Sequence, residues 1–192
     1  MPTNKSGVKS ETGEFLAEKN SVQHELFAKY FPGAAVSGPL LLFFEPKEKG
    51  HQKVFSQLLE AYLVLPGNAI VIRQEKPTNE QKESRKKVVE VTASGNELTK
   101  IMRGADMAVV LEMHQDIEKH LLQEGVIIVG HEKSPFLEDY HPNTEAGNSF
   151  VYAEYNPWSV FMAMVRAFET YRFPYDWKHI IRGIVKANSK SE

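Results

Sequence analysis

The longest apolar run in the chain reads Pro39-Leu40-Leu41-Leu42-Phe43-Phe44. Its apolar residues do not alternate with polar ones, so a strand over 40–44 would bury both faces, as strands of parallel sheets do. Downstream of this run, apolar residues from Val54 to Leu63 fall at helical spacing. The dipeptide Pro66-Gly67 then ends the helical pattern, and four apolar residues follow from Ala69 to Ile72. This part of the sequence therefore predicts a strand, a helix and a second strand.

The alternation of strands and helices continues along the rest of the chain. Further strands are expected at 88–91, 107–111, 126–129 and 149–152. Further helices are expected over the charged run Glu80 to Lys87, behind a Ser94–Glu97 capping box, over 117–122, from Asn156-Pro157 to Tyr171, and from Pro174 to Ile184. This order favours one α/β domain with three layers, namely a Rossmann-like, doubly wound, mostly parallel sheet of six strands. No internal repeat or domain boundary is evident.

Composition and charge exclude several classes of protein. The 192 residues include 23 Lys and Arg against 25 Asp and Glu, and this near balance argues against nucleic-acid binding. The absence of cysteine excludes disulfides, thiolate metal sites and cysteine nucleophiles. No apolar segment approaches the roughly 20 residues of a membrane span, and the polar start is unlike a secretory signal, so we expect a cytoplasmic protein without membrane contact. Disordered tails are expected over 1–13 and 188–192, with the folded domain over 14–187.

The loops after the strands carry the candidate site, because Rossmann-type sheets bind ligands beyond the carboxyl ends of their strands. The first such loop, Glu45 to Gly50, places lysines at the expected start of a helix, where free amides could hold a phosphate. Two glutamates in the same loop disfavour an anion, so the residues alone favour a solvated turn. The seven histidines show no metal-ligand spacing such as HExxH, and the chain contains no Walker loop, GxGxxG or GxSxG sequence. We therefore expect no metal, no cofactor and no catalytic residue.

Six segments stand in an order that occurs together in one enzyme family. They are Asn20 to Tyr30 (a short helix), Lys49-Gly50 (Q-K-G), Ile101 to Met107 (I-M-x-G-A-D), Ala146 to Tyr152 (G-x-G-F-x-F), Asn156 to Ser159, and Arg166-Ala167-Phe168 with Trp177 beyond it. In order and spacing they resemble the bacterial glycogen and starch synthases. The resemblance is collinear from about Asn20 to Ala187. It implies the C-terminal, nucleotide-binding half of that family's two-domain GT-B glycosyltransferase fold.

The segments that would hold a sugar nucleotide depart from that family. Glu45 stands where the family has an arginine that, with the Q-K-G lysine, neutralises the phosphates. Glu112 matches the donor-side glutamate of the family's E-P-C-G-L-T-Q segment, but the glycine turn is gone. The family's T-G-G-L is replaced by Lys133-Ser134-Pro135-Phe136, in which Pro135 has no amide hydrogen to offer a diphosphate. The weak candidates for nucleotide-sugar binding are therefore Lys49, Gly50, Glu112 and Lys133.

These departures favour a glycosyltransferase-like domain that is not catalytic by itself, a pseudoenzyme. We expect it to bind a protein partner or to associate with itself, and a glucan or an ADP- or UDP-sugar is a further candidate ligand. Two alternatives stay open. One is a glucosyltransferase that is active only with a separate subunit supplying the N-terminal domain, in which Lys133 would replace the missing arginine. The other is an adaptor unrelated to carbohydrate.

Overall fold

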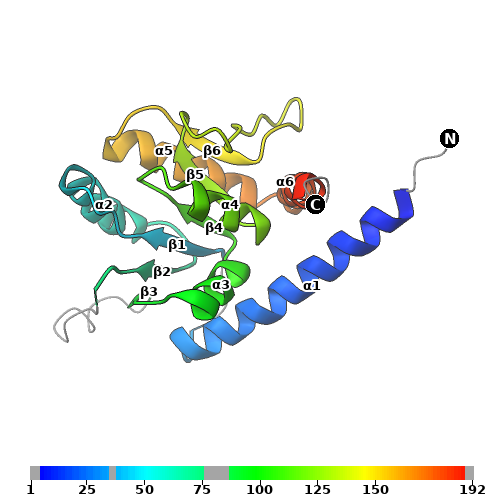
Figure 1. Ribbon diagram of the computed structural model, residues 1–192, viewed down its shortest axis with the longest axis horizontal. Helices are drawn as coiled ribbons and strands as arrows, with labels where there is room; N and C mark the ends of the chain where they lie inside the picture. Colours follow the sequence, from blue (N-terminus) through cyan, green and yellow to red (C-terminus); the bar gives the residue numbers. More distant parts are fainter. Residues whose placement is uncertain (1–4, 35–37, 76–86, 189–192) are drawn as a thin grey trace.

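The computed structural model describes residues 5–34, 38–75 and 87–188, which form a six-stranded sheet covered by helices (Figure 1). The strands are β1 (Leu40–Phe44), β2 (Asn68–Ile72), β3 (Val88–Val91), β4 (Met107–Val109), β5 (Ile127–His131) and β6 (Ser149–Tyr152). They lie in the order β3-β2-β1-β4-β5-β6, and every neighbouring pair is parallel. The predicted Rossmann-like, doubly wound α/β fold is therefore confirmed.

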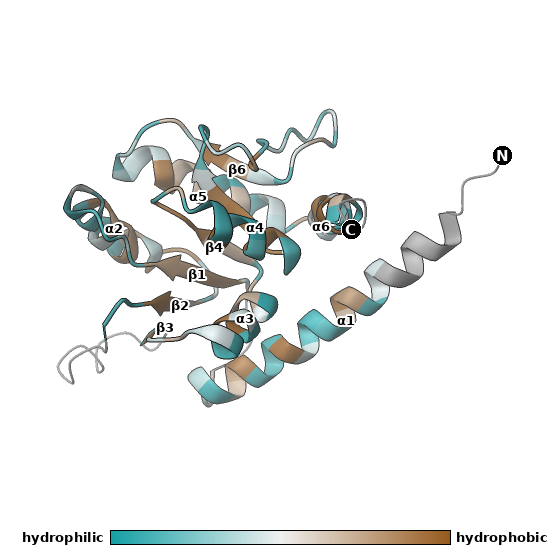
Figure 2. Ribbon diagram, in the orientation of Figure 1, coloured by the Kyte–Doolittle hydropathy of each residue, from teal (hydrophilic) through white to brown (hydrophobic). Residues whose placement is uncertain are grey.

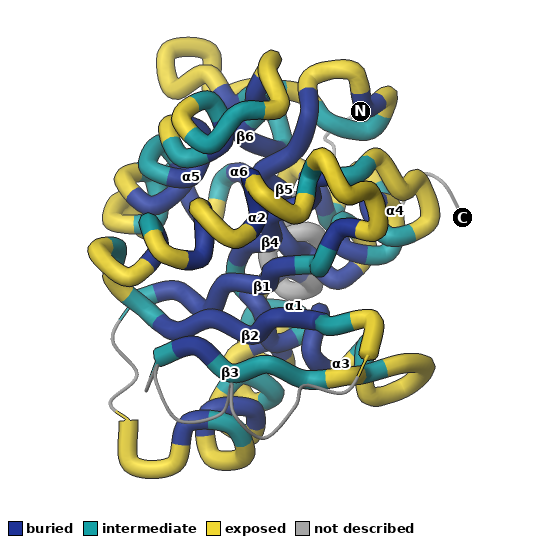
Figure 3. Tube along the Cα trace, turned by 90° about the vertical axis from the view of Figure 1, so that its left-hand side faces the viewer, coloured by how far each residue is buried: buried dark blue, intermediate teal, exposed yellow. Residues whose placement is uncertain are grey.

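The helices form one layer on each face of the sheet. They are α1 (Lys5–Tyr30), α2 (Lys49–Tyr62), α3 (Gly95–Gly104), α4 (Gln115–Gln123), α5 (Pro157–Tyr171) and α6 (Pro174–Asn188). Leu41 and Phe43 of β1 pack in one buried cluster with α2, α5 and α6. Leu40 and Leu42 pack in a second cluster with α1, α3 and α4. The unbroken apolar sequence of β1 is thus explained by burial on both faces, as the apolar strands of Figure 2 and their buried position in Figure 3 show.

The long helix α1 replaces most of the disordered tail that the sequence predicts over 1–13. It begins at Lys5, and the first four residues of the chain lie outside the described part. Lys19, in the middle of α1, is only 3% exposed, and its Nζ donates hydrogen bonds to the backbone oxygens of Arg103 and Glu124. Because nucleation is the costly step of helix formation, a helix anchored in this way extends readily into the polar residues before it.

The predicted capping box at the start of α3 does not form. Ser94 is the N-cap residue of this helix, but its side chain makes no capping hydrogen bond. The carboxylate of Glu97 instead accepts a hydrogen bond from Lys29 Nζ at 2.6 Å and another from the Tyr30 hydroxyl at 3.0 Å. Glu97 therefore holds the end of α1 against α3, a contact between distant segments that competes with the local cap.

The turn between α2 and β2 depends on Gly67. Its φ is +88°, and a Cβ atom at this position would lie 2.2 Å from the backbone oxygen of Pro39. The next residue, Asn68, donates its N–H to that same oxygen at 3.2 Å. Glycine is required here because the chain must pass close to the start of β1 before β2 can pair with it.

Several boundaries differ from the predicted ones. β4 is shorter than the strand predicted over 107–111, and β5 starts and ends after the strand predicted over 126–129. α6 extends to Asn188, the first residue of the expected tail. The charged helix predicted over 80–87 lies outside the described residues except for its last one. Among the helices in the described part of the chain, none combines the length and the apolar character that a membrane crossing needs.

Candidate functional site

An open cleft lies at the carboxyl ends of β1 and β4, the two strands between which the strand order reverses. Rossmann-type sheets bind their ligands at this point, because the loops after the two strands diverge to opposite faces. The cleft has a volume of about 520 Å³. It is lined by Lys47, Glu48 and His51 of the β1–α2 segment, by Glu112, Met113 and His114 of the β4–α4 segment, and by Tyr155 after β6.

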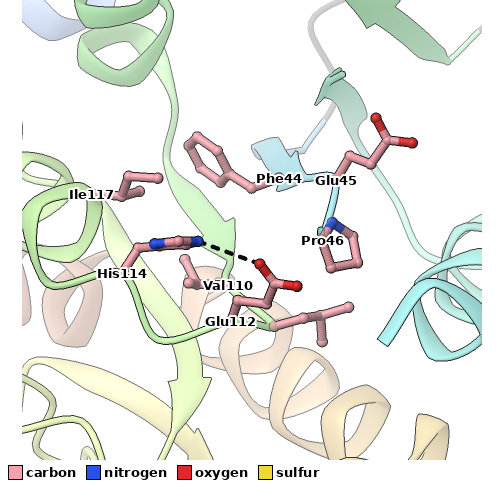
Figure 4. Close-up of a pocket in the computed structure, with 8 residues that line it drawn as sticks. Phe44, Glu45, Pro46, Val110, Glu112, His114 and Ile117 are labelled. Carbon is pink, nitrogen blue, oxygen red and sulfur yellow. Dashed lines mark hydrogen bonds and ion pairs between the residues drawn. The ribbon is translucent and has the colours of Figure 1, made fainter. Parts of the chain in front are cut away.

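Glu112 reaches from the end of β4 to the start of α2. Its carboxylate accepts hydrogen bonds from the backbone N–H groups of Glu48 and Lys47. Its other oxygen, Oε2, lies 3.3 Å from Nε2 of His114. Figure 4 shows Glu112 between His114 and Pro46, at the edge of a smaller apolar pocket. One side chain thus joins the two loops that form the cleft.

The Glu112 carboxylate is charged at neutral pH. Burial by itself would raise its pKa, but the N–H groups of Glu48 and Lys47, together with His114, outweigh burial and hold the pKa below its ordinary value. Unpaired N–H groups at the start of a helix are where anions such as phosphate bind. In this chain, an internal carboxylate binds the N–H of Glu48, the N-cap residue of α2, and that of Lys47 just before it.

Only Glu112 of the four sequence candidates lines the cleft. Lys49 and Gly50 are exposed in the first turn of α2, and Lys133 is exposed just after β5. None of these three belongs to the lining. The two lysines therefore lie near the carboxyl edge of the sheet without converging on the cleft.

Glu45, which replaces the arginine of the resembling family, is held in an ion pair away from the cleft lining. It accepts a hydrogen bond from Arg73 Nη1 at 2.7 Å and one from the Gln74 N–H at 2.9 Å. Arg73 also binds both carboxylate oxygens of Glu90, each at 2.9 Å. The positive charge of Arg73 is thus shared by two carboxylates at the ends of β1, β2 and β3, which leaves little of it for an anionic ligand.

The Lys133–Phe136 segment after β5 is held by a buried carboxylate. The Ser134 hydroxyl donates to Oε2 of Glu118, a residue of α4 that is 1% exposed, at 2.6 Å. Burial raises the pKa of Glu118, although this hydrogen bond opposes the effect. The Phe136 N–H is directed to the Ser134 hydroxyl, and Pro135 has no N–H. The segment that corresponds to the family's T-G-G-L is therefore bonded within the chain.

Tyr155 lies between two histidine rings, an arrangement that the sequence does not indicate. Its ring centroid is 4.4 Å from that of His51, with 21° between the planes, and 4.4 Å from that of His131, with 19°. The three residues come from α2, the end of β5 and the loop after β6. They meet only because the carboxyl ends of parallel strands lie along one edge, so their spacing in the sequence carried no signal.

Three residues of the cleft bring metal-ligating atoms together. Nδ1 of His51 lies 3.5 Å from Oε2 of Glu48 and 3.8 Å from Oε1 of Glu112. One ligating atom from each residue lies within 4.8 Å of the other two. The expectation of no metal rests on the spacing of histidines along the sequence, a criterion that does not cover one histidine and two glutamates from separate loops.

Comparison with known proteins gives a match in structure only. No family model matches the sequence, and no curated protein matches it. Among solved structures, the chain is similar to the catalytic domain of starch synthase IV from Arabidopsis thaliana bound to ADP and acarbose, with a TM-score of 0.71 and 14% sequence identity. The similarity covers 87% of this chain and 38% of that chain, so this chain spans well under half the length of its structural relative. The likeness shows the fold alone, which is the Rossmann-like α/β arrangement of the matching part of that structure.

Proposed function

We propose that this chain is a glycosyltransferase-like domain that does not transfer sugar by itself and that acts by binding a protein partner. One observation carries the proposal: the Glu112 carboxylate occupies the N–H groups of Lys47 and Glu48 at the start of α2. In the family that the sequence resembles, positive charge and free amides hold the diphosphate of the sugar nucleotide. Here the same region of the fold carries an internal anion instead.

The changes around the cleft are large enough to abolish transfer. Removal of one preorganised charge-stabilising donor typically lowers the rate about 10²–10³-fold. Glu45 stands in place of an arginine, and Pro135 replaces one of two glycines whose amides would face the diphosphate. Together these two losses amount to about 10⁴–10⁶-fold, and to less where they are not additive. The charged carboxylate of Glu112 adds repulsion of any diphosphate.

Exposed apolar side chains beside the cleft favour a protein partner. Trp158 and Met162 are 77% and 57% exposed, and they lie one turn apart on α5. Tyr155, which lines the cleft, comes just before this helix. Large apolar side chains that gather on one exposed surface are typical of protein interaction sites.

Calorimetric titration with ADP-glucose and with UDP-glucose, in buffer containing EDTA, tests the proposal. We expect no binding to the wild-type chain at millimolar ligand. We expect the Glu112→Gln variant, which lacks the charge, to gain weak binding of ADP. Glu132→Gln, which removes an exposed glutamate just after β5, is the matched control and should gain none. Stoichiometric, micromolar binding to the wild-type chain would contradict the proposal and favour a glucosyltransferase that works with a separate N-terminal-domain subunit.

Light scattering combined with size-exclusion chromatography tests which kind of partner the surface takes. If a second copy of the chain is the partner, the molecular mass should rise to that of a dimer as the protein concentration increases. The Trp158→Ser variant should then keep the mass of a monomer. If the wild-type chain stays monomeric, self-association is excluded and the proposed partner would be a different chain. Dimerisation that Trp158→Ser and Met162→Ser leave unchanged would contradict a role for this surface in self-association.

A further inference from the structure

We propose that Glu48, His51 and Glu112 bind one divalent transition-metal ion, with Zn²⁺ as the best fit. The three residues line the cleft at the carboxyl ends of β1 and β4. Glu48 and His51 come from the start of α2, and Glu112 comes from the loop after β4. This inference does not depend on the proposed function, because an ion can bind whether or not the chain binds a nucleotide.

The distances between the ligating atoms fit a tetrahedral ion. With bonds of about 2.1 Å to nitrogen and oxygen, two ligands of a tetrahedral zinc ion lie ~3.4 Å apart. Nδ1 of His51 is 3.5 Å from Oε2 of Glu48 and 3.8 Å from Oε1 of Glu112. The remaining separation, between the two carboxylates, is no more than 4.8 Å. The Glu48 side chain is 68% exposed, so small rotations of it would bring the distance between the Glu48 and Glu112 oxygens to about the same length.

The imidazole of His51 is oriented for this role. Its ring is stacked on Tyr155 at 4.4 Å, and the Tyr155 ring is stacked in turn on His131. Nδ1 is buried and makes no hydrogen bond within the described part of the chain, yet it faces two carboxylates. An imidazole nitrogen that faces two carboxylates carries either a hydrogen atom, which points toward them, or a bound cation.

Glu112 is oriented from both sides. One side of its carboxylate is held by the N–H groups of Lys47 and Glu48, and Oε2 is held by Nε2 of His114. Such partners of a ligating carboxylate keep it in position for the ion and raise the affinity. His114 is therefore a positioning residue, since it acts on the ion through Glu112.

The donor set and its charge select the class of ion. Two carboxylates and a neutral imidazole carry a charge of −2, which attracts a divalent cation. The ammonium group of Lys47, which lines the same cleft, repels the ion and offsets part of this attraction. An imidazole ligand suits Zn²⁺ and its neighbours, whereas Mg²⁺ and Ca²⁺ prefer sites made of oxygen alone. Three protein ligands leave a fourth position open toward the cleft, as in zinc sites that bind a water molecule.

Titration of the full chain with ZnCl₂ tests this site, by calorimetry and by competition with a chelating dye at pH 7.5. We expect one ion per chain, bound with micromolar or tighter affinity, and a higher melting temperature in its presence. Glu48→Gln, His51→Ala and Glu112→Gln should each weaken binding at least about tenfold. Mg²⁺ at the same concentration should not compete.

His24→Ala is the matched control, because His24 is exposed on α1, outside the cleft lining. This variant should bind Zn²⁺ like the wild-type chain. Glu48→Gln keeps the test decisive if a variant at a more buried position misfolds, since the Glu48 side chain is mostly exposed. Binding only at millimolar Zn²⁺, or micromolar binding that Glu48→Gln and His51→Ala leave unchanged, would overturn the proposal. Because the nucleotide titrations contain EDTA, their outcome is independent of this one.

Discussion

Lys19 offers a test of how α1 is held on the domain. Its Nζ lies 2.9 Å from the backbone oxygen of Arg103 and 3.1 Å from that of Glu124. These oxygens belong to the ends of α3 and α4, where helix dipoles favour a positive charge. Burial nevertheless lowers the pKa of Lys19 from 10.5 to about 8, and it outweighs the attraction of the Asp106 and Glu124 carboxylates.

The lowered pKa makes stability depend on pH in a defined direction. Between pH 8 and pH 10.5 the unfolded chain holds the Lys19 proton more often than the folded chain does, so the free energy of unfolding rises with pH. The penalty for burying the charged form is fully present below pH 8 and is gone above pH 10.5. Integrated from pH 8 to pH 10, the rise amounts to about 2 kcal/mol.

Urea unfolding of the wild-type chain and of Lys19→Met, measured from pH 7 to pH 10, isolates this effect. Between pH 8 and pH 10, the free energy of unfolding should rise by about 2 kcal/mol more in the wild-type chain than in the variant. Burial also raises the pKa of Tyr62 and Tyr152, which costs stability above pH 10, but both proteins share that loss. Equal pH slopes for the two proteins would refute a pKa of Lys19 that burial lowers.

Three further substitutions have outcomes that urea unfolding can measure. Gly67→Ala should lower the free energy of unfolding by about 3 kcal/mol or more, because the φ of Gly67 is +88° and the new Cβ would meet the Pro39 oxygen. A decrease below 1 kcal/mol would contradict this close approach. Gly183→Ala should raise the free energy of unfolding by about 0.5–1 kcal/mol, since Gly183 lies inside α6 and an added Cβ would have open space around it. A decrease would show that the added Cβ meets a neighbour. Tyr152→Phe should lower the free energy of unfolding by about 1–2 kcal/mol, because the Tyr152 hydroxyl donates to the Val110 backbone oxygen at 3.0 Å. No change would mean that a water molecule takes the place of the hydroxyl.

Local sequence patterns predicted those parts of the fold that depend on local physics. Burial on both faces made the 40–44 strand recognisable, and the Asn156-Pro157 pair marked the start of α5. The Asn156 side chain does accept a hydrogen bond from the Ser159 N–H at 2.9 Å. The N-terminal part of α1 escaped prediction because its anchor, Lys19, contacts backbone oxygens more than 80 residues away in the sequence.

The candidate site could be predicted only in part, for the same reason. Glu112 was recognisable because it matches a glutamate of the resembling family at the end of a strand. Its contact with the start of α2 and the stacking of His51, Tyr155 and His131 depend on which strands lie next to each other. No spacing along the sequence encodes those meetings, because each joins loops that follow different strands.

The position of Glu112 also lowers the apparent affinity of the start of α2 for a free anion. A carboxylate tethered beside its binding partners competes with a dissolved ligand as though it were present at millimolar concentration or more. Dissolved phosphate or nucleotide below that level would lose this competition even if every amide were otherwise suitable. Glu112 would thus compete with any free anion for these N–H groups, and loosening the loop after β4 would relieve the competition without a change at either amide.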